Sequence, residues 1–239
     1  MKLVLGIPDG LEYPMQMSFS PRAIRPGEKV QLTFRITDPK SGKPVQKFEI
    51  VHDRLFHMFV VSQDLGYFLH DHPVLGPDHL FRFTAIFPKA GLYRILGDFY
   101  PAGGTPQLIA KTVIVPGDGL ALAPASLAPD LMPQKSANLE VELVTDPVQP
   151  ISGMKTLMFF KLKPAQGLEK YLGAWGHMLA ASDDLIDLIH SHPFLADGGA
   201  QEQFNLIFPR ARTYRVWVQF QRKGVVNTAA FNVPVSELK

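Results

Sequence analysis

The sequence contains no cysteine among its 239 residues. This absence excludes disulfide bonds, a thiolate nucleophile, cysteine-ligated zinc and iron–sulfur clusters. It also excludes a blue-copper site, because a site of that type needs a cysteine ligand. The lack of cysteine leaves the cellular compartment of the protein open.

Charge is sparse as well. Charged residues make up 19% of the chain, hydrophobic residues make up 46%, and the formal net charge is +2. The lysines and arginines are scattered, so we expect neither a basic groove for nucleic acid nor a basic amphipathic helix for a membrane surface. No window approaches the roughly 20 apolar residues of a membrane-spanning helix. Nucleic acid and a membrane span are therefore not expected.

The first ten residues, MKLVLGIPDG, hold only five apolar residues before Pro8 interrupts them. The apolar core of a signal peptide needs about 7–15 residues. Two alternatives follow. The protein is extracytoplasmic, periplasmic or secreted, if an export signal has been removed, and it is cytoplasmic if the chain is complete.

Proline and glycine are frequent, with 21 and 19 residues, and imply many turns. The apolar runs are short and rich in valine, isoleucine, phenylalanine and tyrosine, and no segment shows the sustained apolar stripe of an amphipathic helix. This pattern predicts an all-β protein built from antiparallel β-sandwiches of immunoglobulin-like or Greek-key type.

The sequence carries one module twice. Strand-like runs, EKVQLTFRI and MKTLMFFKL, follow a proline–glycine pair in each half, and FPKAGLYR (87–94) matches FPRARTYR (208–215) downstream. A stretch rich in proline, alanine and glycine separates the copies and is typical of a linker. We predict a first domain over residues 1–116, a linker over residues 117–136 and a second, homologous domain over residues 137–239.

Histidines recur in one segment of each copy. The segments His57–Pro73 and His177–Pro193 align without a gap and are identical at eight of seventeen positions. All three histidines shared by the copies lie in this segment. Because histidine is the commonest metal ligand in proteins, the cluster is the best functional clue in the sequence. The candidate metal ligands are His57, His70, His72, His177, His190 and His192.

The spacing within the segment predicts a β-hairpin that gathers the histidines. If Ser62 pairs with Tyr67 across a tight turn, His57 lies opposite His72, and His70 points to the same face. Opposed Cβ atoms are about 5 Å apart and diagonal ones about 7–8 Å. Three imidazoles could then converge on one ion at about 2 Å. The second copy has the same spacing and predicts the same geometry.

The first copy has two further candidate ligands. His52 lies five residues before His57, where the second copy has Leu172, and Asp98 corresponds to Gln219. His52 or Asp98 could complete a four-ligand site in the first copy, although each alone also fits a surface or hydrogen-bonded role. If only one copy binds metal, we expect it to be the first.

A purely structural role for the histidines predicts the same repeat, because duplication also copies residues that pack or form hydrogen bonds. Against this role, three imidazoles on one face repel one another when protonated and are costly to bury without partners. A metal ion removes that cost by binding the neutral rings.

The segments HMFVVSQDLGYFLHDHP, FPKAGLYRILGDFYPAG and GAWGHMLAASDD resemble bacterial exported proteins of the YtkA-like kind. These are immunoglobulin-like modules, similar in architecture to CopC-type copper proteins and often associated with heavy-metal transport. The resemblance covers most of both copies. It implies an extracytoplasmic location and copper handling, with the two sets of three histidines as the matching positions.

Three hypotheses for function follow. The first is a non-catalytic protein that binds copper, or alternatively zinc, and that works with a metal-transport or envelope protein. The second is a structural or interaction module of the cell envelope with histidines that hold no metal. The third is a histidine-ligated metalloenzyme, since three histidines and an open position also suit a catalytic metal. No convincing general base or oxyanion device accompanies the histidines, so we expect the chain not to be an enzyme.

Overall fold

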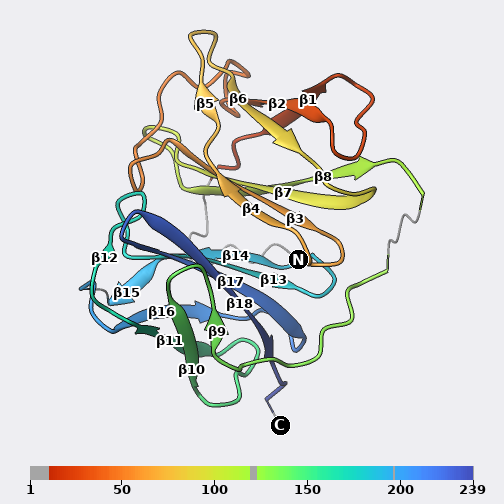
Figure 1. Ribbon diagram of the computed structural model, residues 1–239. Coiled ribbons are helices and arrows are strands. Elements are labelled where there is room, and N and C mark those ends of the chain that lie inside the picture. The colour runs from red at the N-terminus through yellow and green to blue at the C-terminus, as the bar shows by residue number, and fades with distance from the viewer. Residues whose placement is uncertain (1–10, 119–122, 196, 239) are drawn as a thin grey trace. The chain divides into compact units, whose positions relative to one another are not determined.

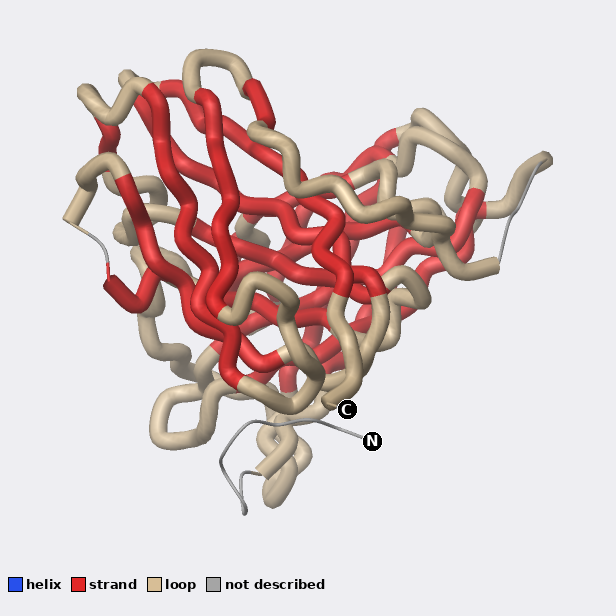
Figure 2. Tube along the Cα trace, turned by 90° about the horizontal axis from the view of Figure 1, so that it is seen from below, coloured by secondary structure: helices blue, strands red, loops and turns tan. Residues whose placement is uncertain are grey.

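The computed structural model describes residues 11–118, 123–195 and 197–238, and the first ten residues, which bear on export, lie outside it. The chain divides into two compact units, unit 1 up to residue 123 and unit 2 from residue 124 onward. Strands, turns and loops make up both units, and the described ranges contain no helix (Figure 2). Accordingly, no helix in these ranges could cross a membrane.

Unit 1 consists of two antiparallel four-stranded sheets (Figure 1). The strand order is β1-β2-β6-β5 in one sheet and β4-β3-β7-β8 in the other. In immunoglobulin nomenclature these are the A-B-E-D and C′-C-F-G sheets. The strands are β1 (Met15–Ser20), β2 (Lys29–Ile36), β3 (Phe56–Ser62), β4 (Phe68–Asp71), β5 (Val74–Leu75), β6 (Phe81–Ile86), β7 (Gly91–Phe99) and β8 (Gln107–Val115).

Unit 2 repeats this topology and adds two short strands. One sheet has the order β15-β16-β11-β10-β9, and in the other β17 pairs with β12, β13 and β18, while β14 pairs with β13. The predicted fold class, two tandem immunoglobulin-like sandwiches, is therefore confirmed. The strands are β9 (Gln134–Lys135), β10 (Glu140–Asp146), β11 (Lys155–Lys163), β12 (Leu168–Glu169), β13 (His177–Ser182), β14 (Leu188–Ser191), β15 (Pro193–Leu195), β16 (Gln201–Ile207), β17 (Thr213–Arg222) and β18 (Val225–Pro234).

Each unit has its own hydrophobic core between its two sheets. Alternation along the strands supplies it, because successive side chains of a strand point to opposite faces. On β2, for example, Val30, Leu32, Phe34 and Ile36 are buried while the residues between them are more exposed. Burying one such side chain stabilises the fold by about 1.5–3 kcal/mol.

A tyrosine at the start of the F strand fixes the preceding corner in both units. The hydroxyl of Tyr93 donates to the carbonyl of Lys89 at 2.9 Å, and the hydroxyl oxygen of Tyr214 lies 3.1 Å from the carbonyl oxygen of Arg210 and accepts from the backbone N–H of Arg210 at 3.2 Å. This arrangement is the tyrosine corner of immunoglobulin-like folds. It supports the strand assignment in a chain that lacks the disulfide of antibody domains.

Part of the predicted linker lies against unit 2. The side-chain amide of Asn232 donates to the carbonyl of Ala128 at 2.8 Å, Asp130 forms an isolated bridge with Asn232, and β9 pairs with β10. Residues 119–122 lie outside the described ranges. The predicted boundaries at residues 116 and 136 stay predictions.

Candidate functional site

The histidine segment of each copy folds as the predicted hairpin. In unit 1, Phe59 of β3 lies opposite His70 of β4, and the backbone N–H of Ser62 donates to the carbonyl of Tyr67 at 3.1 Å. In unit 2, Leu179 of β13 lies opposite His190 of β14. Both registers are the predicted ones. The even number of turn residues keeps the three histidines of each copy on one face, because a shift by one residue would turn the strand over.

The methionine that follows the first histidine belongs to the opposite face. Met58 and Met178 are fully buried and lie in the hydrophobic cores of units 1 and 2. His57 and His177 therefore point away from those cores, since neighbouring residues of a strand face opposite sides. The histidines thus occupy the outer face of the C′-C-F-G sheet in each unit.

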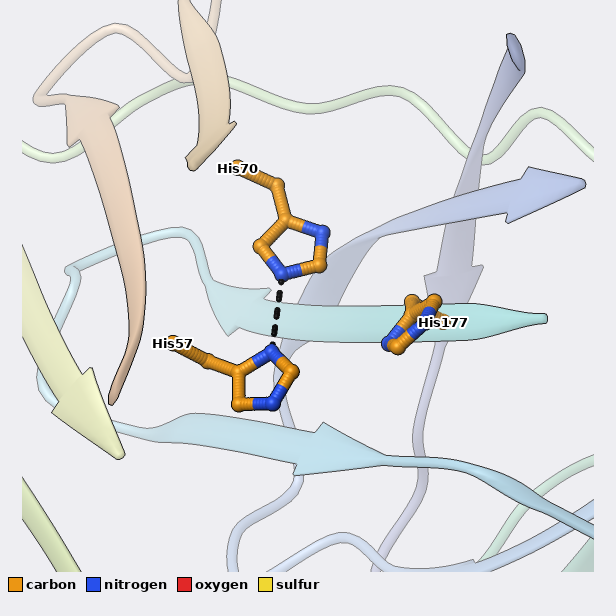
Figure 3. Close-up of side chains that lie close together, drawn as sticks. All are labelled: His57, His70 and His177. Carbon is orange, nitrogen blue, oxygen red and sulfur yellow. Dashed lines mark hydrogen bonds between the residues drawn. The ribbon is translucent and has the colours of Figure 1, made fainter. Parts of the chain in front are cut away.

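The three imidazoles of unit 1 gather around one nitrogen atom. Nδ1 of His57 lies 3.3 Å from Nε2 of His70 and 3.2 Å from Nε2 of His72. Figure 3 shows the rings of His57 and His70 facing each other with these nitrogens. His57 and His70 are buried, with 2% and 7% exposure, and His72 is half-buried. We call His57, His70 and His72 triad 1.

Unit 2 repeats this arrangement. Nδ1 of His177 lies 3.0 Å from Nε2 of His192, and one ring nitrogen from each of His177, His190 and His192 lies within 4.8 Å of the others. His177 is buried with 1% exposure, and the other two are half-buried. We call these three residues triad 2. All three rings of triad 2 thus offer mutually close nitrogens, whereas for triad 1 the measured separations are those from Nδ1 of His57 to each of the other two rings.

A backbone carbonyl sets the orientation of the central histidine in both triads. Nε2 of His57 is 2.9 Å from the carbonyl oxygen of Val51, and Nε2 of His177 is 2.8 Å from that of Tyr171. A carbonyl oxygen can only accept a hydrogen bond, so Nε2 must carry the proton. In the neutral ring, Nδ1 then holds a lone pair, and that lone pair points into the triad.

A tight turn supplies each of these carbonyls. Val51 and Arg54 form an isolated bridge around His52 and Asp53, whose φ angles are 47° and 61°. Positive φ at both central residues defines a type I′ turn. In unit 2 the same turn has Leu172 and Gly173 at its centre, with φ angles of 51° and 79°.

The two additional candidates of unit 1 have different positions. His52 sits in the turn, and its place in unit 2 is taken by Leu172. Asp98 lies on β7 directly opposite His57, as Gln219 on β17 lies opposite His177. The predicted equivalence of Asp98 and Gln219 is confirmed. Asp98 thus shares the face of triad 1, whereas His52 belongs to the turn that orients it.

The donor set fits a transition-metal ion. With metal–nitrogen distances of about 2.0–2.1 Å, nitrogen ligands at the corners of a tetrahedron lie about 3.3 Å apart. The measured separations from the central Nδ1 atoms are 3.0, 3.2 and 3.3 Å. Histidine ligands of metals usually donate their other N–H to a carbonyl or carboxylate. The carbonyls of Val51 and Tyr171 accept in that way.

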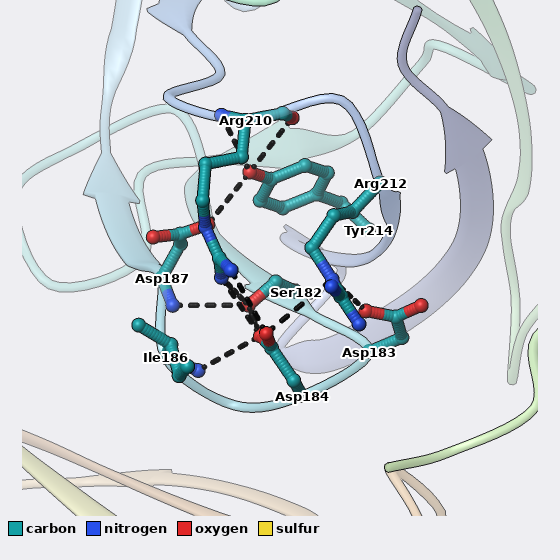
Figure 4. Close-up of polar contacts among 8 residues, drawn as sticks. All are labelled: Ser182, Asp183, Asp184, Ile186, Asp187, Arg210, Arg212 and Tyr214. Atoms are coloured by element: carbon teal, nitrogen blue, oxygen red, sulfur yellow. Dashed lines mark hydrogen bonds and ion pairs between the residues drawn. The ribbon is translucent and has the colours of Figure 1, made fainter.

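Ion pairs anchor the far end of the hairpin in unit 2 (Figure 4). The guanidinium of Arg210 binds both carboxylate oxygens of Asp184 at 2.8 and 2.9 Å and Asp187 at 2.8 Å. The hydroxyl of Tyr214 also donates to Asp187 at 2.8 Å, and Arg212 pairs with Asp183. We call these six residues the turn clamp. It fixes the turn that connects β13 to β14.

Contacts within the turn clamp shift the pKa values of Asp184 and Arg210 among others. Burial acts to raise the pKa of Asp184, but hydrogen bonds from Arg210 and Ser182 outweigh burial and hold it well below the usual range. The hydrogen bond to Asp184 in turn raises the pKa of Arg210. Unit 1 has Tyr67 in the place of Asp187, where it packs edge-on against Tyr93 with ring centroids 6.0 Å apart.

A buried carboxyl group in unit 2 had no functional assignment from the sequence. Glu202 on β16 is fully buried, and its place in unit 1 is taken by the core residue Phe81. One carboxylate oxygen accepts from the backbone N–H of Gly198 at 3.0 Å, and the other has no hydrogen-bond partner among the residues that the structure describes. Burial raises its pKa to about 7.

The carbonyls of Val51 and Tyr171 and the turn clamp were also not predicted. Carbonyl groups are common to every residue, so only the turn geometry identifies these two. The sequence carries only a weak signal for the turn clamp, because Asp184 lies between the two predicted strands of the hairpin but its partner Arg210 lies 26 residues away.

Strand order and site thus define a tandem immunoglobulin-like protein with one histidine triad in each unit. The chain belongs to the family described as a domain of unknown function (DUF8832), whose model matches residues 9–117 and again residues 131–237. A search of curated proteins gave no match.

Solved structures with partial likeness include two bacterial adhesins and a tandem of titin Ig domains. The Escherichia coli adhesin FdeC is 16% identical with a TM-score of 0.29, over 92% of this chain and 63% of its own. The Yersinia pseudotuberculosis adhesin InvE is 10% identical with a TM-score of 0.29, over 93% and 60%. The titin immunoglobulin tandem A164–A165 is 10% identical with a TM-score of 0.27, over 95% and 98%.

This chain spans less than two thirds of the length of either adhesin structure. The fold assignment rests on strand order, register and the tyrosine corners.

Proposed function

We propose that this protein is a non-catalytic binding module that holds copper, or alternatively zinc, in triads 1 and 2. The observation that carries the proposal is the lone pair of Nδ1 on His57 and on His177. In each unit this lone pair points into the triad. Nδ1 of His57 lies 3.3 Å from Nε2 of His70 and 3.2 Å from Nε2 of His72, and Nδ1 of His177 lies 3.0 Å from Nε2 of His192. Imidazole suits both ions, and copper(II) binds more tightly than zinc at equal geometry.

Calorimetric titration with copper(II) and zinc(II) tests this proposal. The variants are His70→Ala/His72→Ala, which removes triad 1, His190→Ala/His192→Ala, which removes triad 2, and the combination of both pairs. We expect two bound ions per wild-type chain, one in each double variant and none in the combination. Equal binding by all four proteins would refute the proposal.

A second candidate function is a structural or interaction module in which the histidines hold the hairpin. The hydrogen bonds from His57 to Val51 and from His177 to Tyr171 favour it, because they join the turn before β3 or β13 to the hairpin. Under this alternative, the histidine variants unfold at lower temperature without metal, and added metal does not stabilise the wild type. Under the metal proposal, added metal raises the unfolding temperature of the wild type and leaves that of the variant with all four histidines replaced unchanged.

Location and partners form part of the same proposal. We place the protein outside the cytoplasm, with a metal-transport or envelope protein as its partner. The support is the resemblance of the histidine segments to YtkA-like exported proteins. Cell fractionation of the native protein, followed by recovery of cross-linked partners, tests both points.

A further inference from the structure

The two triads differ in the side chain that faces the central histidine from the next strand. Asp98 on β7 lies opposite His57, and Gln219 on β17 lies opposite His177. Opposed side chains of an antiparallel pair share one face, with Cβ atoms about 4.5–5.5 Å apart. Because β3 lies between β4 and β7, His57 has His70 on one side and Asp98 on the other. A carboxylate therefore flanks triad 1, and an amide flanks triad 2.

The following strand accentuates this difference. In unit 2, the amide nitrogen of Gln219 donates to the hydroxyl of Thr228 on β18 at 3.1 Å. In unit 1, the residue opposite Asp98 on β8 is Leu108, an apolar residue.

We propose that Asp98 and Gln219 give the two triads different metal preferences. Triad 1 favours a divalent ion, zinc(II) or copper(II), and triad 2 is relatively better suited to copper(I). This inference rests on the proposed metal-binding function. It identifies Asp98 and Gln219 as the residues that determine the metal specificity of triad 1 and triad 2.

The physical reason is charge. Three neutral imidazoles leave the full charge of a bound ion uncompensated, whereas a nearby carboxylate cancels one unit. The Coulomb energy is proportional to the product of the charges, so a carboxylate attracts a divalent ion twice as strongly as a monovalent one at the same distance. His57 and His70 are buried and Asp98 is half-buried, so solvent screens this attraction only in part. Carboxylate oxygen also suits harder ions than imidazole does.

The experiment measures each triad separately. His190→Ala/His192→Ala leaves triad 1 as the parent for Asp98→Asn. Zinc(II) affinity is measured by competition with a chromophoric zinc chelator, and copper(I) affinity by competition with a copper(I) chelator under anaerobic conditions. Thermal unfolding of metal-free protein verifies that each variant folds as its parent does.

The reciprocal variant is Gln219→Glu, made in the parent His70→Ala/His72→Ala, which retains triad 2. It introduces a carboxylate where unit 1 has one. The two substitutions change the charge in opposite directions at equivalent positions, so each serves as the control for the other.

Asp98→Asn is expected to weaken zinc(II) binding by about 10–100-fold, the usual effect of removing a group next to a metal ligand. Copper(I), with half the charge, should lose only about 3–10-fold. Gln219→Glu should increase the preference of triad 2 for zinc(II). Equal changes for both ions, or an unchanged zinc(II) affinity in Asp98→Asn, would overturn the inference. If neither parent binds either ion, the proposed function fails and this inference fails with it.

Discussion

The central histidine of each triad has one ring nitrogen occupied by a backbone carbonyl. Nε2 of His57 donates to Val51, and Nε2 of His177 donates to Tyr171. This contact fixes both the ring orientation and the tautomer, which leaves Nδ1 available for a ligand. Metal binding by Nδ1 therefore requires the ring proton of His57 and of His177 to lie on Nε2.

Nitrogen-15 NMR of the imidazole groups tests this assignment. Without metal, His57 and His177 are expected as Nε2–H tautomers at a pH where the rings are neutral. Added zinc(II) should shift the Nδ1 resonances of both residues and leave the proton on Nε2. An Nδ1–H tautomer at either residue would contradict the orientation described here.

Glu202 predicts a pH dependence of stability in unit 2. Its pKa is raised from 4.5 to about 7 by burial, so folded protein binds more protons than unfolded protein between these values. The stability of unit 2 should therefore fall as pH rises from about 4.5 to about 7, by at most about 3 kcal/mol, and stay lower above pH 7. Glu202→Gln should abolish this fall.

Tryptophan fluorescence during urea unfolding is a suitable measurement, because both tryptophans, Trp175 and Trp217, lie in unit 2. Glu237→Gln, at an exposed position near the end of the same unit, is the matched control and should retain the dependence of the wild type. A Glu202→Gln protein that loses stability in parallel with the wild type would contradict the prediction.

At the scale of elements, the hairpin is the part that the sequence predicts best. Its register follows from local information, namely strand alternation and an even turn, and both copies give the same answer. The turn clamp could not be predicted in the same way. It joins Asp184 to Arg210 across 26 residues. That contact depends on the position of the loop between β16 and β17 relative to the hairpin turn.

The turn clamp should make a measurable contribution to the stability of unit 2. Arg210→Ala removes three hydrogen bonds to two mostly buried carboxylates, but Arg210 itself is 37% exposed. A loss of about 1–2 kcal/mol is therefore expected at pH 7. The difference from wild type should diminish as pH falls below about 4. The ionised carboxylate of Asp184 contributes its full stabilisation only above the pKa of Asp184 in the unfolded chain, and this stabilisation is lost as pH falls toward the lower pKa of the folded protein.

Lys89→Ala is the matched control, since Lys89 occupies the corresponding corner of unit 1. It should leave the unfolding transition seen by the tryptophans of unit 2 unchanged. An Arg210→Ala protein as stable as the wild type at pH 7 would show that the clamp contributes nothing.

At the scale of the whole molecule, one topology is built twice with different cores. In unit 1, Phe56 packs closely over Gly97, where an added Cβ would lie 2.6 Å from the ring. Unit 2 has Gly176 in the place of Phe56 and Val218 in the place of Gly97. The loss of a large side chain at one position is thus accompanied by the gain of a larger side chain at a neighbouring one, and the strand order is the same in both units.

The tandem organisation could be predicted because repeated strand and turn patterns survive this divergence. The replacement of Phe81 by Glu202 had no such signal, since strand alternation marks a position as inward-facing but does not reveal how a buried acid is accommodated. The family match over both copies agrees with the tandem organisation.

X-ray absorption spectroscopy of the zinc-loaded or copper-loaded protein tests whether the triads bind the ion through their imidazole rings. We expect a shell of imidazole nitrogens at about 2.0 Å with about three rings per ion, and its loss in the combined variant His70→Ala/His72→Ala/His190→Ala/His192→Ala. A shell of oxygen ligands without imidazole, or a spectrum that the combined variant leaves unchanged, would contradict it.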